Sequence, residues 1–253
     1  MKNGGTNSFA IFHLTSTGIS IKHIMTKKPK LVVLSGAGIS AESGIQTFRD
    51  GDGLWENHRI EDVATPEAFK RNPQLVLDFY NFRRAGIREA QPNAAHLGLA
   101  ALEKDFEVHI ITQNIDDLHE RAGSTNVYHL HGELLKMRSV KDTEQLFPVE
   151  GDIKIGDVAP DGGQLRPHIV WFGEAVPMIY EVMPLLAAAD ILCVIGTSLQ
   201  VYPAAGLVHE VSPGTPVFVI DRKIPPVSHI KNVTRIEKPA TEGVKDLITL
   251  LSI

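Results

Sequence analysis

The chain has 253 residues, of which 43% are hydrophobic and 22% are charged, and its formal net charge is -5 at pH 7. This composition is ordinary for a globular protein and leaves room for one large α/β domain, with or without a small insert. A net negative charge argues against a nucleic-acid-binding protein, and no apolar run approaches the roughly 18 residues that span a membrane, so we expect no specific nucleic-acid partner and no membrane partner.

The first 26 residues do not have the pattern of a targeting segment. The apolar run Phe9–Phe12 is too short for the core of a signal peptide, and no small-residue cleavage site follows it. Met25 lies just before the first expected strand and resembles a natural start, so we expect residues 1–26 to form a loosely ordered extension. The single cysteine, Cys193, cannot form an intrachain disulfide, which fits a reducing compartment. We therefore expect a cytoplasmic protein.

A buried strand runs into a glycine turn near the start of the remaining chain. Leu31–Leu34 is a short apolar run of the kind found in parallel sheets. Ser35–Gly38 then lets the backbone turn and brings amide groups close to an anion, and Ile39–Ser43 has the pattern of a helix start. This order predicts a pyrophosphate site, and a plain tight turn is the alternative because the dinucleotide fingerprint is incomplete. Gly36, Gly38 and Ala41 match three positions of that fingerprint.

Strands and helices alternate through most of the chain. Helices are predicted after the capping residue Thr65, after Asn72, and over 94–104, 183–189, 203–211 and 243–251. Strands are predicted over 106–111, 127–130, 191–195 and 217–220, with a helical turn over 116–121. This alternation predicts a Rossmann-like α/β fold, with a mostly parallel sheet that has helices on both faces.

A weakly apolar segment interrupts this alternation. Between 136 and 166, charged residues alternate with glycines, and apolar residues that could anchor a core are few. We therefore expect a smaller inserted domain, built from insertions at about 54–92 and 136–166.

Polar or glycine residues follow four of the predicted strands. In open α/β sheets, ligands bind beyond the carboxyl ends of the strands, so Gly36, Gln113, Gly196 and Asp221 would face one crevice. A short carboxylate at the end of a strand suits the hydroxyls of a ribose, although an Asp that only forms a turn is the alternative.

Three motifs carry a resemblance to a known family. The stretch from Lys30 to Trp55, the sequence TQNID at 112–116 and the sequence HGEL at 131–134 together resemble the sirtuin family of NAD-dependent protein-lysine deacylases. The resemblance extends roughly from Lys30 to the C-terminus and implies a catalytic domain over 27–253. It implies that NAD is consumed as a co-substrate, that the partners are acyl-lysine proteins or peptides, and that the products are nicotinamide and O-acyl-ADP-ribose.

The resemblance also implies the residues of the site. His131 would act as the general base, and Asn114 and Asp116 would hold the nicotinamide, while Phe48 and Arg49 would cover the reacting sugar. The catalytic residues implied are His131 and Asn114. The NAD-binding residues implied are Gly36, Ala37, Gly38, Ser40, Glu42, Phe48, Arg49, Trp55, Gln113, Asn114, Asp116, Gly196, Thr197, Ser198, Asp221 and Ala240. From the residues alone, a structural histidine at 131 and a helix-capping role for Asp116 stay open.

A second set of residues is expected to bind the acyl-lysine. The segment Val170, Trp171, Phe172 and Gly173 would line the channel for the lysine stem. Ala64, Tyr80 and Arg83 match the pattern of the sirtuin subgroup that removes succinyl and malonyl groups. Tyr80 and Arg83 share one face of a predicted helix, where a phenol and a guanidinium would bind a carboxylate. The alternative for Arg83 is a surface charge.

The sequence departs from the family in its metal site. Most sirtuins hold a structural zinc with four cysteines in the small domain. The segment 137–166 contains no cysteine, and Ser139 stands where the first ligand is expected. We therefore expect no zinc and no other metal site.

Two other functions compete with a deacylase. An NAD-dependent protein ADP-ribosyltransferase would share the cofactor chemistry, and a non-catalytic module would only bind NAD or ADP-ribose. The presence of His131 and Asn114 argues against the binding module. Tyr80 and Arg83 favour the deacylase, because a transferase has no need to bind an acyl carboxylate.

Overall fold

The computed structural model describes residues 13–15, 18–20, 27–46, 54–55 and 58–251. Its main element is a six-stranded sheet with the strand order β13-β12-β11-β3-β6-β7, in which all neighbours are parallel. The strands are β3 (Lys30–Ser35), β6 (Glu107–Thr112), β7 (Val127–His129), β11 (Ile191–Ile195), β12 (Val217–Asp221) and β13 (Val233–Glu237). The predicted Rossmann-like sheet is confirmed, and β13 is a strand that the sequence pattern did not indicate.

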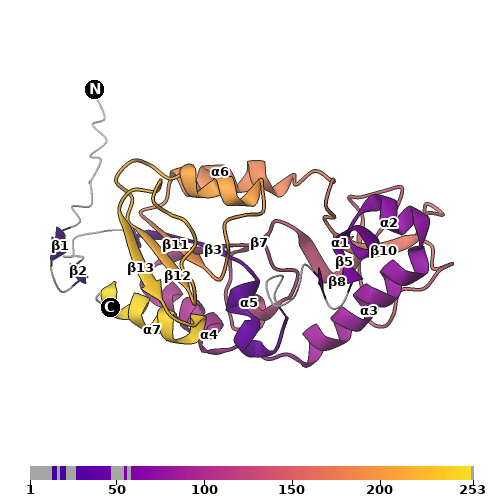
Figure 1. Cartoon of the computed structure of the whole chain (residues 1–253), viewed down its shortest axis with the longest axis horizontal. Coiled ribbons are helices and arrows are strands. Elements are labelled where there is room, and N and C mark those ends of the chain that lie inside the picture. Colours follow the sequence, from indigo (N-terminus) through magenta and orange to yellow (C-terminus); the bar gives the residue numbers. More distant parts are fainter. Residues whose placement is uncertain (1–12, 16–17, 21–26, 47–53, 56–57, 252–253) are drawn as a thin grey trace, which may run out of the picture.

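Both faces of this sheet are buried under helices. Leu31 and Val33 of β3 belong to the core on one face, and Val32 and Leu34 belong to the core on the other, as the twofold alternation of a strand requires. The first face is covered by α4 (Ala94–Ala101) and α7 (Ala240–Leu250), and the second by α6 (Met178–Ala187) and the 3-10 helix η4 (Ala204–His209) (Figure 1). Burial on both faces explains why the strands are continuously apolar.

A smaller lobe lies at the other end of the molecule (Figure 1). It contains α1 (Ile60–Val63), α2 (Pro66–Arg71) and α3 (Pro73–Glu89), and a three-stranded antiparallel sheet of order β10-β8-β9. The strands of this sheet are β8 (Gly132–Ser139), β9 (Leu146–Pro148) and β10 (Leu165–Ile169). The predicted combination of a large parallel sheet with a smaller lobe is therefore confirmed, whereas the proposed domain limits stay a prediction.

The helices of the smaller lobe begin where their capping residues predict. The Thr65 hydroxyl accepts a hydrogen bond from Ala68 N at 3.0 Å, and the Asn72 side chain accepts one from Leu75 N at 3.2 Å. A proline follows each cap, at a position where the missing N–H costs no helical hydrogen bond. The Arg84 Nε then donates to Leu134 O at 2.9 Å and ties α3 to β8.

The prediction of a helix that starts within 39–43 is wrong. The chain forms two single 3-10 turns there, η1 (Ala37–Ile39) and η2 (Ala41–Ser43). Gly44 ends the second turn in the left-handed region, with φ 85°, which most residues adopt only with strain. The glycine turn therefore lacks the dipole of a long helix behind it.

The other described elements are short. They are β1 (His13–Thr15), β2 (Gly18–Ser20), β4 (Leu54–Trp55), β5 (His58–Arg59), η3 (Leu102–Lys104) and α5 (Leu118–Arg121). Most of 1–26 lies outside the described residues, so the loosely ordered extension stays a prediction. Among the helices of the described ranges, none has the length and apolar character needed to cross a membrane.

Candidate active site

A cavity of about 750 Å³ lies between the carboxyl ends of the parallel strands and the smaller lobe. This is the edge at which α/β sheets bind ligands. Of the residues predicted for the site, those that line this cavity are Gly36, Ala37, Gly38, Trp55, Ala64, Tyr80, Arg83, Gln113, Asn114, Asp116, His131, Val170, Trp171, Phe172, Gly173, Gly196, Thr197, Ser198, Asp221 and Ala240. The structure therefore brings residues from most of the chain to one place.

Of the other predicted residues, two are not described and two are placed differently. Phe48 and Arg49 lie outside the described residues. Ser40 and Glu42 are described but are not part of the cavity wall. The Glu42 carboxylate instead accepts hydrogen bonds from Thr241 N at 3.0 Å and Thr241 Oγ1 at 2.8 Å, at the start of α7.

The two glycine turns of the site interlock. Gly36 N donates to Ile195 O at 3.0 Å and Gly38 N donates to Gly196 O at 2.8 Å. A Cβ on Gly38 would lie 2.7 Å from Gly196 Cα, which no side chain could tolerate. Close packing of the two turns therefore explains these glycines by itself, and their role in binding a phosphate stays a prediction.

Ser40 lies behind the cavity wall and orients two residues of it. The buried Ser40 Oγ donates to Asp116 Oδ2 at 3.1 Å and accepts from Asn114 Nδ2 at 3.0 Å. His96 Nε2 lies 3.4 Å from the same oxygen. Since a hydroxyl has one proton to donate and two lone pairs, these three contacts satisfy it completely. The amide of Asn114 is thereby fixed in one orientation at the cavity.

Asp116 lines the cavity and also contacts the start of α5. Its Oδ1 accepts from Leu118 N at 3.2 Å, whereas the N-cap residue of α5 is Asp117, whose side chain makes no capping bond. Burial raises the pKa of Asp116, against the opposing effects of the hydrogen bonds from Leu118 and Ser40.

His131 has the tautomer of a base. Its Nδ1 lies 3.1 Å from the backbone oxygen of Gln113, which can only accept, so Nδ1 carries the proton. In the neutral imidazole, Nε2 then carries the lone pair. Burial lowers the pKa of His131, and the hydrogen bond to Gln113 opposes this only in part. The ring is therefore neutral at neutral pH, as a general base must be.

Tyr80 and Arg83 lie deep in the part of the cavity formed by the smaller lobe. Tyr80 is fully buried, and its hydroxyl oxygen accepts a hydrogen bond from Trp171 Nε1 at 3.1 Å. Burial raises the pKa of Tyr80, so its phenol stays protonated. The Arg83 guanidinium lies 4.3 Å from the ring centre of Trp55, and the residue is only 8% exposed. The alternative of a surface charge at Arg83 is therefore wrong.

The segment 170–173, directly after β10, is held by contacts on several sides. The Arg166 guanidinium stacks 3.2 Å from the ring centre of Trp171 and forms a 2.6 Å ion pair with Glu174. The Glu174 carboxylate also accepts from Trp171 N at 2.8 Å. Val170 N donates to His131 O at 2.9 Å, which joins this segment to His131.

Several residues of the wall were not expected from the sequence. Arg222 and Lys223 line the cavity directly after Asp221, and their position after a predicted strand end could have indicated them. Gln200, Val201 and Tyr202 also line it, but they come from a loop without a recognisable pattern.

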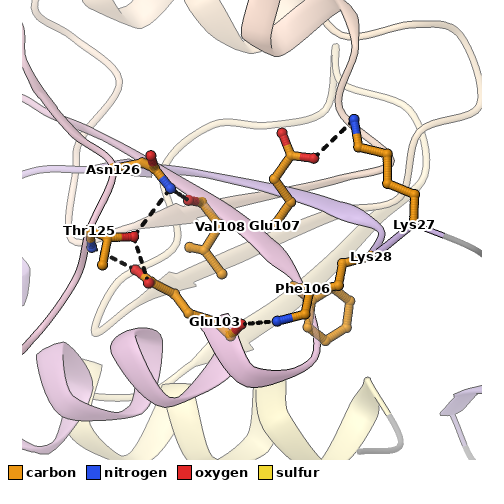
Figure 2. A pocket seen from close by; sticks show the side chains of 8 residues that line it. All are labelled: Lys27, Lys28, Glu103, Phe106, Glu107, Val108, Thr125 and Asn126. Atoms are coloured by element: carbon orange, nitrogen blue, oxygen red, sulfur yellow. Dashed lines mark hydrogen bonds and ion pairs between the residues drawn. The ribbon is translucent and has the colours of Figure 1, made fainter.

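A second hollow, of about 420 Å³, lies beside the start of β6 (Figure 2). Its polar groups bind one another: Lys28 Nζ donates to Glu103 O at 2.8 Å, and the Glu103 carboxylate accepts from Thr125 N and Oγ1, each at 2.8 Å. Lys27 forms a 3.2 Å ion pair with Glu107. These contacts stabilise the edge of the sheet and aim no polar group at a ligand.

The described residues contain no group of three or more His, Cys, Asp or Glu side chains that could hold a metal ion. Cys193 is buried in β11, and burial raises the pKa of its thiol to about 12.

The chain is similar to proteins of known family. The profile of the Sir2 family matches residues 36–203. A protein of Helicobacter pylori (strain ATCC 700392 / 26695) named NAD-dependent protein deacylase is 55% identical over 221 residues, which are 87% of this chain and 96% of that protein. The solved complex of a Sir2 homologue with NAD is 41% identical, with a TM-score of 0.78, over 87% of this chain and 88% of that one. A Sir2 protein solved with a deacetylated p53 peptide and an acetyl ADP-ribose is 32% identical, with a TM-score of 0.72, over 87% and 93% of the two chains.

Proposed function

The chain belongs to the Sir2 family, and we propose that its cavity is the active site of an NAD-dependent protein-lysine deacylase that removes acetyl, succinyl and malonyl groups. Its partners would be proteins or peptides that carry acyl-lysine. The observation on which the acyl preference rests is the pair Tyr80 and Arg83, which is buried in the same cavity as the candidate base His131.

The polar half of the cavity offers the hydrogen-bonding and charged groups that NAD would need. The amide of Asn114 offers both kinds of hydrogen-bonding group that a carboxamide needs, and Ser40 holds it in place from behind. Thr197 and Ser198 offer hydroxyls, while Arg222 and Lys223 offer positive charge next to Asp221. When bound, NAD would supply a ribose carbon from which nicotinamide can leave.

His131 would act as the base of the reaction. Its Nε2 lone pair would take a proton from a ribose hydroxyl, and the Nδ1 bond to Gln113 would keep the ring oriented throughout. Because Val170 N binds His131 O, the acyl-lysine channel and the base would move as one unit.

Acidic acyl groups would be recognised at the far end of the channel. Since the Tyr80 oxygen accepts from Trp171, its own proton remains available to a carboxylate. The Arg83 guanidinium would supply the opposite charge in an environment that is almost closed to water. Ala64, also buried in the wall, leaves room for a chain longer than acetyl.

The experiment is nicotinamide release with acetyl-, succinyl- and malonyl-lysine peptides and the variant Arg83→Met. A hydrogen bond to a charged group contributes about 1.5–3 kcal/mol, so we expect desuccinylation to fall roughly 10- to 100-fold and deacetylation to change less than about threefold. Arg88→Met is the matched control, because Arg88 is exposed on the same helix and is not part of the cavity wall. Equal loss with all three peptides would reject the assignment of Arg83.

An ADP-ribosyltransferase is the second candidate, because it would use the same NAD site. The Tyr80 and Arg83 pair favours the deacylase. Release of nicotinamide that does not depend on an acylated peptide would favour the transferase instead.

A further inference from the structure

Two histidines, one at the end of β7 and one in the turn that follows it, hold consecutive carbonyls of the same loop. His131 Nδ1 lies 3.1 Å from Gln113 O, and His129 Nδ1 lies 3.0 Å from Asn114 O. Leu130, between them, is buried in the core beneath the sheet. Both imidazoles therefore face the loop 113–116, on either side of the buried Leu130.

The two rings differ in what their other nitrogen meets. His131 lines the cavity, whereas His129 Nε2 lies 2.7 Å from Glu120 Oε1 of α5. A backbone carbonyl and a carboxylate can both only accept, so His129 must donate from both nitrogens to satisfy both contacts. This requires the imidazolium form of His129.

We propose that His129 is a positioning residue of the reaction: held as an imidazolium by Glu120, it fixes the backbone of Asn114 and so the orientation of the amide that meets the nicotinamide. The proposal rests on the deacylase function proposed above. His129 itself would not touch the substrate, because it acts through the loop.

The charges around His129 favour its protonated form. Glu120 faces it from α5, Asp116 from the loop and Glu133 from β8, while His119 of α5 is the neighbouring imidazole. Burial alone would lower the pKa of His129, but the hydrogen bond to Glu120 and its charge outweigh burial and raise it above the ordinary value. The same pair lowers the pKa of Glu120 despite partial burial.

Because the pKa of His129 is raised, its contact with Glu120 stabilises the protein only over a defined pH range. A histidine whose pKa is higher in the folded state than in the unfolded state supplies its stabilisation fully below the unfolded value and loses it as the pH rises through the folded value. Neutral His129 has one proton left, so it must give up either Asn114 or Glu120. We expect this loss to produce an alkaline limb in kcat/KM for NAD.

The decisive variant is Glu120→Gln. Its amide is neutral, so the charge that favours the imidazolium is gone, and its NH2 group can donate to the Nε2 lone pair of a neutral His129. Imidazole NMR of the substrate-free protein reports the titration of His129, whose signals are identified by their loss in His129→Gln. We expect the His129 midpoint to lie at least about one pH unit lower in Glu120→Gln than in the wild type. The alkaline limb of kcat/KM for NAD should then be lost from its wild-type position, because neutral His129 can keep both of its partners in this variant.

A control variant and two contradicting outcomes complete the test of His129. Glu103→Gln also removes a carboxylate that holds a neighbouring segment, but at the second hollow, and should leave the midpoint and the limb in place. An unchanged His129 midpoint in Glu120→Gln, or a limb that stays fixed while the midpoint moves, would overturn the proposal. Wild-type protein without acyl-dependent nicotinamide release would instead overturn the deacylase function, since the NMR titration needs no substrate.

Discussion

At the scale of single residues, the site depends on which histidines are charged. Burial lowers the pKa of His131, lowers that of His96 to about 4, and lowers that of His119 well below its ordinary value. Of these four histidines, only His129, with a carboxylate at 2.7 Å, has its pKa shifted upward. Neighbouring imidazoles in one small region are thus set to opposite charge states by their hydrogen-bond partners.

The charge state of His131 leads to a prediction for the acid side of the pH profile. A base works only when it is unprotonated, so activity should be retained as the pH falls to the ordinary value near 6.5 and be lost only below it. His131→Asn should lower kcat by roughly 100- to 10,000-fold. The measurement is kcat/KM for an acyl-lysine peptide between pH 5 and 8. An acid limb centred above pH 6.5 would contradict a half-buried, neutral base at position 131.

At the scale of elements, α5 connects the two halves of the cavity. It directly follows the loop 113–116, and its Arg121 reaches the C-terminal end of α3, which carries Tyr80 and Arg83. Arg121 Nη1 donates to Ile87 O at 3.2 Å and Nη2 donates to Ala90 O at 2.6 Å. A cation at these carbonyls satisfies groups that the helix leaves unpaired and interacts well with its dipole.

The prediction for this contact concerns stability. Arg121→Ala should lower the free energy of unfolding by about 1–3 kcal/mol, because two charge-assisted hydrogen bonds to a helix end are lost. Equilibrium unfolding in urea measures this change in the free energy of unfolding. Arg59→Ala is the control, since Arg59 is 71% exposed in its 3.5 Å pair with Glu61 and such pairs contribute about 1 kcal/mol or less. A loss no larger than in the control would show that the cap is unimportant.

The scale of elements also shows how far sequence patterns extend. The apolar runs predicted the central strands, since strands buried on both faces need no polar alternation. They missed β13, whose Val233, Thr234 and Arg235 are half-buried or exposed at the edge of the sheet. They also mistook the turns after Gly36 for a helix, because Gly44 and the side-chain contacts of Ser40 end each turn early.

Within the site, the sequence predicted the residues that follow strand ends, and chain position alone placed Gln113, Asn114 and His131 at one edge. It could not predict which side chains meet behind that edge. The contact between Ser40 and Asp116 joins residues 76 positions apart, and the one between His129 and Asn114 depends on how β7 packs beside β6. Such contacts are set by the packing of elements, so local patterns carry no signal for them.

At the scale of the whole molecule, the smaller lobe has its own means of stability. Leu77, Val149, Ile153 and Leu165 form a small core between α3 and the antiparallel sheet. Beside it, Ser139 at the end of β8 is hydrogen-bonded to Asp161, in the turn before β10, at the position where a zinc ligand is expected in most sirtuins. This contact would take the place of a metal in holding the end of β8 to that turn.

Ser139 is the residue that tests this. Its hydroxyl is buried, donates to Asp161 Oδ1 at 2.9 Å and accepts from Lys141 N at 3.0 Å. Ser139→Ala leaves the Lys141 amide without this partner, which costs about 1–2 kcal/mol and should lower Tm by roughly 2–8 °C in a chain of this size. The exposed Glu150 provides the control variant Glu150→Ala, which should leave Tm unchanged. If hydrogen bonds replace the metal, a zinc chelator should change neither Tm nor activity. A fall in Tm or activity with the chelator, together with stoichiometric zinc by elemental analysis, would show that a metal holds the lobe.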